Sequence, residues 1–383
     1  MANSEASRAL KAKPRLLILS ASTGNGHISA AKALLDMALE MGLDAETYDA
    51  LDFTPRAFRA WFRGGYEGLV RFNPGLWGHL YRTSDKKLFN FYVQTALDWW
   101  ACGGLEEKIE SFSPDWVVCT HSVVQPRLVQ FRKRFGFRTA IVLTDIYPHL
   151  MWLRGDPDWY FVPTERSQDF LESRLPSMVG HVEVSGMPIH KAFALVGATR
   201  KPHGGRLRVL VTAGGIGGGP VLQVVQNLAS LNVDITCVAG RNADAEAQLK
   251  VAAAKYTNLV VHGHVPLTEM AELMAQSDVL VAKSGGLTTF EALASGCAFV
   301  VYRPFLIPGQ EEGNADYLEQ IGAGVSAVGL EDLHSTISRM SQNPELVAQM
   351  QAASLSHGKP EACRFIIDHL IAMSKINPAK PPR

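Results

Sequence analysis

The chain has 383 residues, of which 47% are apolar and 19% are charged. This is the composition of a globular protein, and the length is sufficient for two domains with separate cores. Lysine plus arginine and aspartate plus glutamate both number 37, so no overall positive field favours sequence-independent binding to nucleic acid. The five cysteines include no C-x-x-C pair, which argues against a disulfide framework or a zinc ribbon and fits a reducing cytoplasm.

Two segments bear on membrane contact. Residues 1–14 are polar, so we expect a flexible tail rather than a secretory signal. The longest uncharged stretch, residues 209–233, carries five glycines and a proline in its first half. This composition predicts a strand, a glycine loop and a helix rather than a transmembrane span. Any membrane contact is therefore expected to be peripheral.

Short apolar, β-branched runs alternate along the chain with longer segments of helical period. The first series of expected strands covers residues 15–21, 45–48, 116–120, 139–144, 160–162 and 181–184. The second series covers residues 208–213, 234–239, 259–261, 279–282, 298–302 and 324–327. This alternation predicts an α/β fold in which helices cover both faces of parallel sheets. We expect Rossmann-like domains over residues 15–196 and 207–359, joined by a glycine-rich and charged linker over residues 197–206.

Residues 53–104 interrupt this alternation. They hold 13 of the 33 aromatic residues of the chain, and seven basic residues against three acidic ones. Aromatic bodies with cationic heads suit the interface of an anionic membrane, and Trp61, Trp99 and Trp100 are the candidate contacts. Alternatively, these aromatic residues pack a helical insertion onto the first domain.

The first expected strand runs into the loop Ser-Ala-Ser-Thr-Gly-Asn-Gly-His, which ends at His27. Gly24 and Gly26 allow backbone N–H groups and a helix N-terminus to approach a polar ligand. A dinucleotide site would have a third glycine at position 29, where this chain has Ser29, so that interpretation is the weaker one. His27 is a candidate general base near neutral pH; alternatively, it hydrogen-bonds the loop backbone.

Asp145 follows the fourth expected strand, and His149 and Trp152 come shortly after it. A carboxylate at this strand end is placed to orient His27 or to act as the base itself; alternatively, it only caps the next turn. The D-x-D sequence at Asp156 and Asp158 is typical of metal-dependent sugar transferases, but it lies in a proline turn, and we interpret it as accidental.

The second expected domain opens with five glycines among residues 214–219. Such a loop, followed by a helix N-terminus, suits a diphosphate. Residues 262–265 follow a strand and offer backbone groups to a base. Glu291 lies about one turn into a helix and is a candidate partner for ribose hydroxyls; alternatively, it is a solvated first-turn acid. The amides and carboxylates of residues 308–314 suit the hydroxyls of a sugar.

Eight motifs occur in an order that resembles the monogalactosyldiacylglycerol synthase and processive diacylglycerol glucosyltransferase family. They are STGNGH, LTDIYPHLMW, VSGMPI, TAGGIGGGPV, VAGRN, HGHVP, AKSGGLTTFEAL and PGQEEGN. The resemblance spans residues 16–324 and implies an inverting glycosyltransferase of family 28 with the GT-B fold, in which two Rossmann-like domains face a central cleft. It implies that no metal or other cofactor is required, and that a helix over residues 360–376 returns to the N-terminal domain.

The resemblance also implies roles for individual residues. His27 and Asp145 fall at catalytic positions. With the loops described above, the donor-binding residues are expected to be Gly214, Gly215, Gly217, Gly218, Gly263, Val265, Lys283, Ser284, Gly285, Thr288, Glu291, Gln310, Glu311 and Asn314. The acceptor or membrane residues are expected to be Gly26, Trp61, Trp99, Trp100, His149 and Trp152.

The expected activity is transfer of a hexose from UDP-glucose or UDP-galactose to the hydroxyl of diacylglycerol or a related lipid. The expected location is peripheral, on the cytoplasmic face of an anionic membrane. The first loop reads GNGH, closer to the bacterial glucosyl enzymes than to the plant GGGH form, and the choice of sugar stays open. The alternatives are a GT-B enzyme with a soluble acceptor, a UDP-sugar epimerase, and a non-catalytic nucleotide-sugar binding protein.

Overall fold

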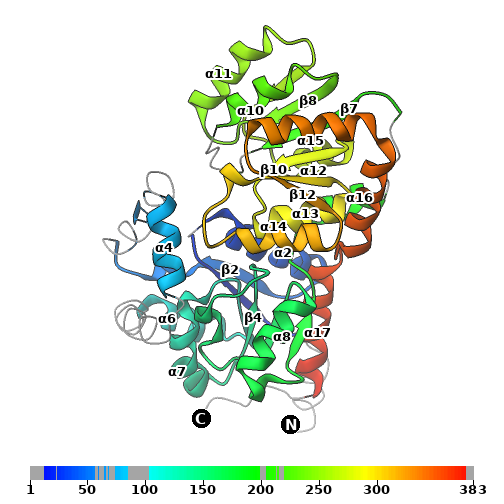
Figure 1. The fold of residues 1–383 in the computed structure, drawn as a ribbon. Coiled ribbons are helices and arrows are strands. Elements are labelled where there is room, and N and C mark those ends of the chain that lie inside the picture. Colours follow the sequence, from blue (N-terminus) through cyan, green and yellow to red (C-terminus); the bar gives the residue numbers. More distant parts are fainter. Residues whose placement is uncertain are drawn as a thin grey trace. The chain divides into compact units, whose positions relative to one another are not determined.

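The computed structural model describes residues 13–22, 24–56, 59, 64–65, 68, 74–84, 103–198, 204–212, 214 and 220–376 (Figure 1). The chain divides into two compact units. The first comprises Met1–Pro188 with Glu361–Arg383, and the second comprises Ile189–Pro360. Each unit contains one parallel sheet of six strands, so the predicted α/β fold is confirmed.

The sheet of the first unit has the order β2-β1-β3-β4-β5-β6. Its strands are β1 (Leu16–Ser20), β2 (Ala45–Asp49), β3 (Trp116–Cys119), β4 (Arg138–Val142), β5 (Trp159–Val162) and β6 (Val182–Val184). Its helices are α2 (Asn25–Glu40), α4 (Pro74–Ser84), α6 (Gly103–Phe112), α7 (Gln125–Phe135), α8 (Glu165–Arg174) and α17 (Ala362–Ile376), with short 3₁₀ helices η1 (Ala50–Phe53), η2 (Ser122–Val124), η3 (Leu150–Leu153) and η4 (Pro176–Met178).

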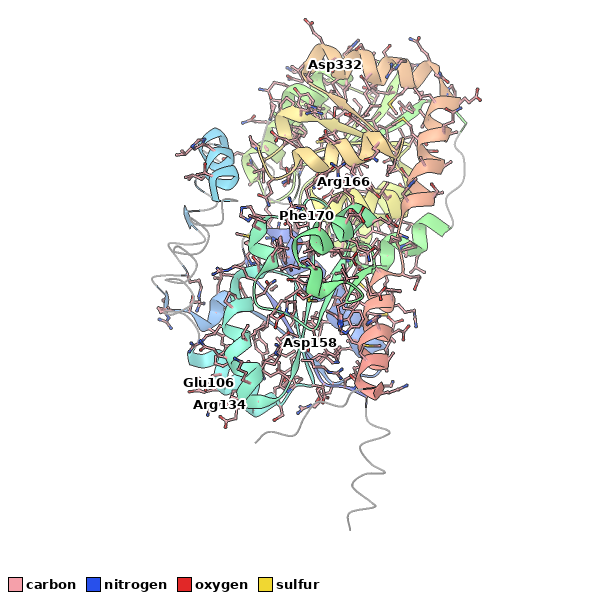
Figure 2. All side chains as sticks on the ribbon, turned by 60° about the horizontal axis from the view of Figure 1, so that its bottom comes forward. Glu106, Arg134, Asp158, Arg166, Phe170 and Asp332 are labelled. Carbon is pink, nitrogen blue, oxygen red and sulfur yellow. The ribbon has the colours of Figure 1, made fainter. Side chains whose placement is uncertain are left out.

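Successive residues of β1 are buried on opposite faces of this sheet. Leu17 and Leu19 join the core cluster that includes residues of α6 and α7, whereas Leu16 and Ile18 join the cluster that includes residues of α2 and α17. Because helices cover both faces, the strand is apolar at every one of these positions. The helices α2 and α17 contact each other on one face (Figure 1). On the other face, Glu106 of α6 and Arg134 of α7 form an ion pair (Figure 2).

The sheet of the second unit has the order β12-β11-β10-β7-β8-β9. Its strands are β7 (Leu207–Thr212), β8 (Val233–Val238), β9 (Leu259–His262), β10 (Val279–Ala282), β11 (Ala298–Tyr302) and β12 (Gly324–Ala327). Its helices are α9 (Lys191–Ala198), α10 (Val221–Leu228), α11 (Ala243–Ala253), α12 (Leu267–Gln276), α13 (Gly286–Ser295), α14 (Glu312–Gln320), α15 (Leu330–Gln342) and α16 (Pro344–His357), with the 3₁₀ helix η5 (Arg303–Phe305).

Each sheet has a point at which the direction of strand addition reverses. In the first unit it lies between β1 and β3, and in the second unit it lies between β7 and β10. Loops at the carboxyl ends of the two strands diverge there and leave room for a ligand. The fold therefore positions one candidate site in each unit.

The boundary between the units differs from the expected one. The compact units divide after Pro188, whereas the N-terminal domain was expected to reach residue 196, with a linker over residues 197–206. The reason is α9, which packs against α12 and α13 of the second unit. At Gly197 of α9, an added Cβ would lie 1.8 Å from the carbonyl oxygen of Ala294, so this close approach requires glycine. The helix expected over residues 360–376 is α17, which belongs to the first unit.

The aromatic-rich segment falls largely outside the described residues, as do Trp61, Trp99 and Trp100. Among the helices that the structure describes, none has both the length and the apolar character needed to span a bilayer. Of the cysteines, Cys119, Cys237, Cys297 and Cys363 are buried.

Candidate active site

The site in the first unit is built on the loop between β1 and α2. Gly24 precedes α2 with φ of 121°, a conformation that favours glycine. The turn brings His27 into the first turn of α2, where its side chain is 9% exposed. Gly26 is half-buried beside it.

Two threonines fix the orientation of the His27 ring. The Nδ1 atom lies 2.9 Å from the carbonyl oxygen of Thr120 and 2.7 Å from Oγ1 of Thr144. Since a carbonyl oxygen only accepts hydrogen bonds, Nδ1 carries the proton. The lone pair is therefore on Nε2, to which no described residue forms a hydrogen bond. The Thr120 hydroxyl also donates to the carbonyl oxygen of His27 at 2.9 Å, which ties the loop after β3 to the first turn of α2.

Burial favours the neutral form of His27. Desolvation lowers the pKa of His27, although the charge of Asp145 and the Thr120 carbonyl oppose that shift. The ring of His121 meets His27 edge-on, with centroids 4.6 Å apart. Burial holds the pKa of His121 well below its usual value, and its Nδ1 accepts a hydrogen bond from the Val123 amide at 3.1 Å. The site thus presents an imidazole whose burial favours the neutral form, with Nε2 unbonded among the described residues.

Asp145 lies near this imidazole but hydrogen-bonds elsewhere. Its Oδ2 accepts a hydrogen bond from Nε1 of Trp152 at 3.0 Å. Burial raises the pKa of Asp145, and the charges of His27 and His149 oppose that shift. In this structure the threonines orient His27, whereas Asp145 acts on it through its charge. His149 accepts a hydrogen bond from the Met151 amide at 3.1 Å and so caps η3, the 3₁₀ helix that carries Trp152.

The site in the second unit is built on the loops after β7 and β10. Gly214 follows β7 with φ of +82°, and a Cβ on it would lie 3.3 Å from Cε of Lys283, which follows β10. Gly215, Gly217 and Gly218 lie outside the described residues. Helix α13 begins after Gly285 without a side-chain cap, so its first N–H groups are available to an anionic ligand. Thr288 lies in the first turn of this helix.

The loop that precedes α14 completes this group. Glu311 accepts a hydrogen bond from Lys283 Nζ at 2.5 Å and another from the Ile307 amide at 2.9 Å. Ser284 donates to the Glu311 carbonyl oxygen at 3.0 Å, and Asn314 donates to the Ser284 carbonyl oxygen at 2.7 Å. Two pairs of expected donor residues from distant parts of the sequence are therefore in direct contact: Lys283 and Ser284 with Glu311 and Asn314.

Glu291 is buried in α13. Its side chain is 8% exposed, and it has no hydrogen-bond or ion-pair partner among the described residues. Burial raises the pKa of Glu291 to about 7. The interpretation of Glu291 as a solvated first-turn acid is therefore wrong, and a buried carboxyl without a protein partner suits a ligand with hydroxyl groups.

The remaining expected donor residues lie in the loop after β9 and in the loop before α14. Gly263 follows β9, and a Cβ there would lie 2.4 Å from the Glu246 carboxylate. Val265 is 9% exposed. The buried Oε1 atom of Gln310 has no hydrogen-bond partner among the described residues.

The D-x-D sequence has a structural role here. Asp158 accepts hydrogen bonds from the Thr139 amide at 2.8 Å and from Nη1 of Arg132 at 3.1 Å. Arg132 also donates to the carbonyl oxygen of Asp156 at 2.9 Å. Within the described part of the chain, no group of three or more histidine, cysteine, aspartate or glutamate side chains is arranged to hold a metal ion.

Sequence reasoning missed Thr120, Thr144 and His121. Thr144 belongs to a quoted motif but was not selected, because a single hydroxyl carries little chemical signal. Thr120 and His121 follow β3, which lies on the opposite side of β1 from β2. The sheet order, rather than the sequence, brings them to His27.

Family models match both halves of the chain. Residues 27–189 match monogalactosyldiacylglycerol (MGDG) synthase, and residues 210–364 match the glycosyltransferase family 28 C-terminal domain. Similar proteins include the processive diacylglycerol beta-glucosyltransferase of Bacillus pumilus, 27% identical with 94% of this chain and 96% of the relative covered. The enzyme of that name from Bacillus subtilis is 26% identical, with 96% and 97% covered.

Solved structures share the fold. MurG of Acinetobacter baumannii aligns with a TM-score of 0.62 at 16% identity, covering 94% of this chain and all of MurG. UDP-GlcNAc 2-epimerase of Neisseria meningitidis aligns with a TM-score of 0.61 at 14% identity, covering 94% and 99%. At these identities the likeness concerns the fold alone.

Two Rossmann-like units of this topology, with a family 28 domain in the second, define a UDP-sugar-dependent glycosyltransferase of the GT-B class. Residues 27–189, in its first unit, match the monogalactosyldiacylglycerol synthase model. The family resemblance predicted from the motifs is thus confirmed by models that match both halves of the chain.

Proposed function

We propose that this enzyme transfers glucose from UDP-glucose to the hydroxyl of diacylglycerol, or of a related lipid, with inversion at the anomeric carbon. The observation that carries the proposal is the buried His27 ring, whose Nδ1 proton is engaged by Thr120 and Thr144 while Nε2 is left unbonded by the described residues. The choice of acceptor and sugar is supported by the names of the Bacillus relatives and by the GNGH sequence of the first loop.

His27 is the general base in this proposal. As the acceptor oxygen attacks the anomeric carbon, its proton passes to Nε2, and the bond between that carbon and the diphosphate oxygen breaks on the opposite face. The resulting imidazolium is stabilised by the Thr120 carbonyl and by the charge of Asp145, both of which favour the protonated ring. Asp145 therefore supports the base and does not replace it.

The second unit holds the donor. Glu291 accepts the ribose hydroxyls, and the uracil lies against the backbone of Gly263 and Val265. The loop from Gly214 and the first N–H groups of α13 bind the diphosphate and stabilise the charge that develops on it. Gln310 and Glu311 accept hydroxyls of the sugar. With this donor set and the Lys283 ammonium, we propose that no metal ion is required.

We also propose peripheral contact with the cytoplasmic face of an anionic membrane, through the aromatic and basic residues 53–104. This rests on their composition. Sedimentation with anionic vesicles tests it: we expect binding that weakens with salt and with alanine at Trp61, Trp99 and Trp100. If the chain does not bind vesicles, a soluble acceptor is favoured instead.

Mass spectrometry of the products tests the reaction. The enzyme is incubated with diacylglycerol and either UDP-glucose or UDP-galactose, and a control omits the acceptor. We expect a glucosylated lipid from UDP-glucose and no product with the His27→Ala variant, which should still bind UDP. A new sugar formed without acceptor would indicate an epimerase, and activity retained by His27→Ala would remove His27 as the base.

A further inference from the structure

Lys283 lies between two parts of the donor site. Its Cε atom lies against Gly214, where an added Cβ would be only 3.3 Å away. Its Nζ atom lies 2.5 Å from Oε1 of Glu311. The side chain of Lys283 is 25% exposed and that of Glu311 is 7% exposed. The Lys283 side chain therefore passes Gly214 and ends at the Glu311 carboxylate.

Glu311 is fixed by its other atoms. Its Oε2 accepts the Ile307 amide at 2.9 Å, and its carbonyl oxygen accepts the Ser284 hydroxyl at 3.0 Å. Among the described residues only Lys283 bonds to Oε1. If Lys283 moves away, Glu311 cannot follow it, and a buried carboxylate loses the ammonium that neutralises it, which is costly unless other donors replace that ammonium.

We propose that Glu311 and the diphosphate of the donor compete for the Lys283 ammonium, so that recognition of the sugar controls stabilisation of the leaving group. This inference rests on the proposed donor site. Without ligand, Glu311 neutralises Lys283. When a UDP-hexose is bound, sugar hydroxyls donate to Glu311 Oε1, and Lys283 Nζ turns to the β-phosphate oxygens.

The competition makes UDP and UDP-hexose different ligands. UDP attracts Lys283 but has no hexose hydroxyl to donate to Glu311, because its ribose hydroxyls bind Glu291 in the proposed donor site. It therefore binds against the cost of an unpaired carboxylate. A UDP-hexose replaces the lost hydrogen bond. A sugar whose hydroxyls do not reach Glu311 leaves Lys283 paired with the carboxylate. The diphosphate then departs without stabilisation by the Lys283 ammonium.

Calorimetric titration of the full-length protein with UDP tests the competition. Glu311→Gln keeps an oxygen for the Ile307 amide but no longer holds the ammonium, so we expect it to bind UDP about tenfold more tightly than the wild type. Lys283→Met should bind UDP about tenfold more weakly, and the double variant should match Lys283→Met. Glu319→Gln, at an exposed position of α14 outside the donor loops, is the matched control and should leave UDP affinity unchanged.

A merely structural role for Glu311 predicts the opposite sign, because a disturbed loop weakens UDP binding. Weaker or unchanged UDP affinity in a folded Glu311→Gln variant would therefore overturn the competition, as would additive effects in the double variant. If the wild type does not bind UDP at all, the proposed donor site fails first, and the two failures are distinguished.

A second measurement uses only wild-type enzyme, in case the variants do not fold. The donors are UDP-deoxyglucoses that each lack one hydroxyl. With the donor that lacks the hydroxyl bonded to Glu311, kcat should fall about tenfold or more. If every deoxy donor changes KM alone, sugar recognition is not coupled to departure of the diphosphate and the inference is wrong.

Discussion

His27 obtains its properties from residues 93 and 117 positions further along the chain. Thr120 and Thr144 follow β3 and β4, neighbouring strands of the first sheet. Parallel strands end at the same edge of a sheet, so their last residues converge on the loop after β1. The hydrogen bonds that orient His27 come from neutral groups, whereas the carboxylate of Asp145 is bonded to Trp152.

Replacing Thr144 by valine removes one of these hydrogen bonds while keeping the shape of the side chain. The ring then loses part of its orientation and its preference for the Nδ1 proton. We expect kcat to fall about tenfold to a hundredfold, with KM for the UDP-sugar unchanged. Steady-state kinetics of Thr144→Val and of Thr336→Val, a buried threonine of α15, provide the comparison. Equal kcat in Thr144→Val and wild type would show that Thr144 does not orient the base.

Glu291 connects stability to pH. Burial raises its pKa from 4.5 to about 7, so the ionised carboxylate is disfavoured in the folded protein. The penalty is absent below pH 4.5, grows as the pH rises, and is complete above about pH 7. Glu291→Gln removes it. We therefore expect this variant to be more stable than the wild type by about 2–3 kcal/mol at pH 8, and by about 1 kcal/mol or less at pH 5.

Urea denaturation at both pH values checks this expectation, and UDP titration completes it. Because an amide replaces the charge-assisted acceptor of the ribose hydroxyls, Glu291→Gln should bind UDP more weakly by about 1.5–3 kcal/mol. A stability difference that does not depend on pH would mean that burial does not shift this carboxyl. Unaltered UDP affinity would remove Glu291 from the donor site.

At the scale of elements, hydrogen bonds to Asp156 and Asp158 hold the loop before β5 in place. Asp158 accepts three hydrogen bonds, two from Thr139 and one from Arg132. Asp158→Ala should therefore lower the free energy of unfolding by about 1–3 kcal/mol, with kcat retained at a permissive temperature and activity unaffected by EDTA. Asp156→Asn is the control: the Asp156 carboxylate is 81% exposed, and asparagine tolerates its φ of 42°. Loss of activity on chelation would instead indicate a metal site.

The sequence predicts elements better than contacts in this protein. All twelve expected strands are present within one or two residues of their expected limits, because strands buried on both faces are recognisable as short β-branched runs. The loops at their carboxyl ends pointed to His27, Lys283 and Glu291 for the same reason. Partners were harder to predict: nothing local marks Thr120 as the residue that bonds His27, or shows that Asp145 is bonded to Trp152 instead. The burial of Glu291 also depends on tertiary packing that a helix position alone does not reveal.

At the scale of the whole molecule, the first unit is discontinuous in sequence, since α17 belongs to it although the second unit intervenes. The helix buries Ile366, Ile367 and Leu370, each at most 1% exposed. It is also held by two polar contacts: Trp116 Nε1 donates to Ser374 Oγ at 2.8 Å, and Arg138 donates to the Met373 carbonyl oxygen at 2.9 Å. The last helix therefore closes the core formed by the first half of the chain.

Truncation after Pro360 should unfold the first unit selectively. Each large apolar side chain lost from the core removes about 1.5–3 kcal/mol of burial, and several are lost together, whereas the core cluster around Val209 and Val211 of the second unit includes no residue of α17. Calorimetric melting with and without UDP measures this: we expect the truncated chain to lose transfer activity and one unfolding transition, while a transition that UDP shifts upward remains.

Leu370→Ala should lower the free energy of unfolding of the first unit by about 2–5 kcal/mol. Leu355→Ala, at a 45% exposed position of α16, is the control and should have little effect. If truncation abolishes the UDP-dependent transition too, the two units do not fold independently, and the donor site depends on the first unit for its stability.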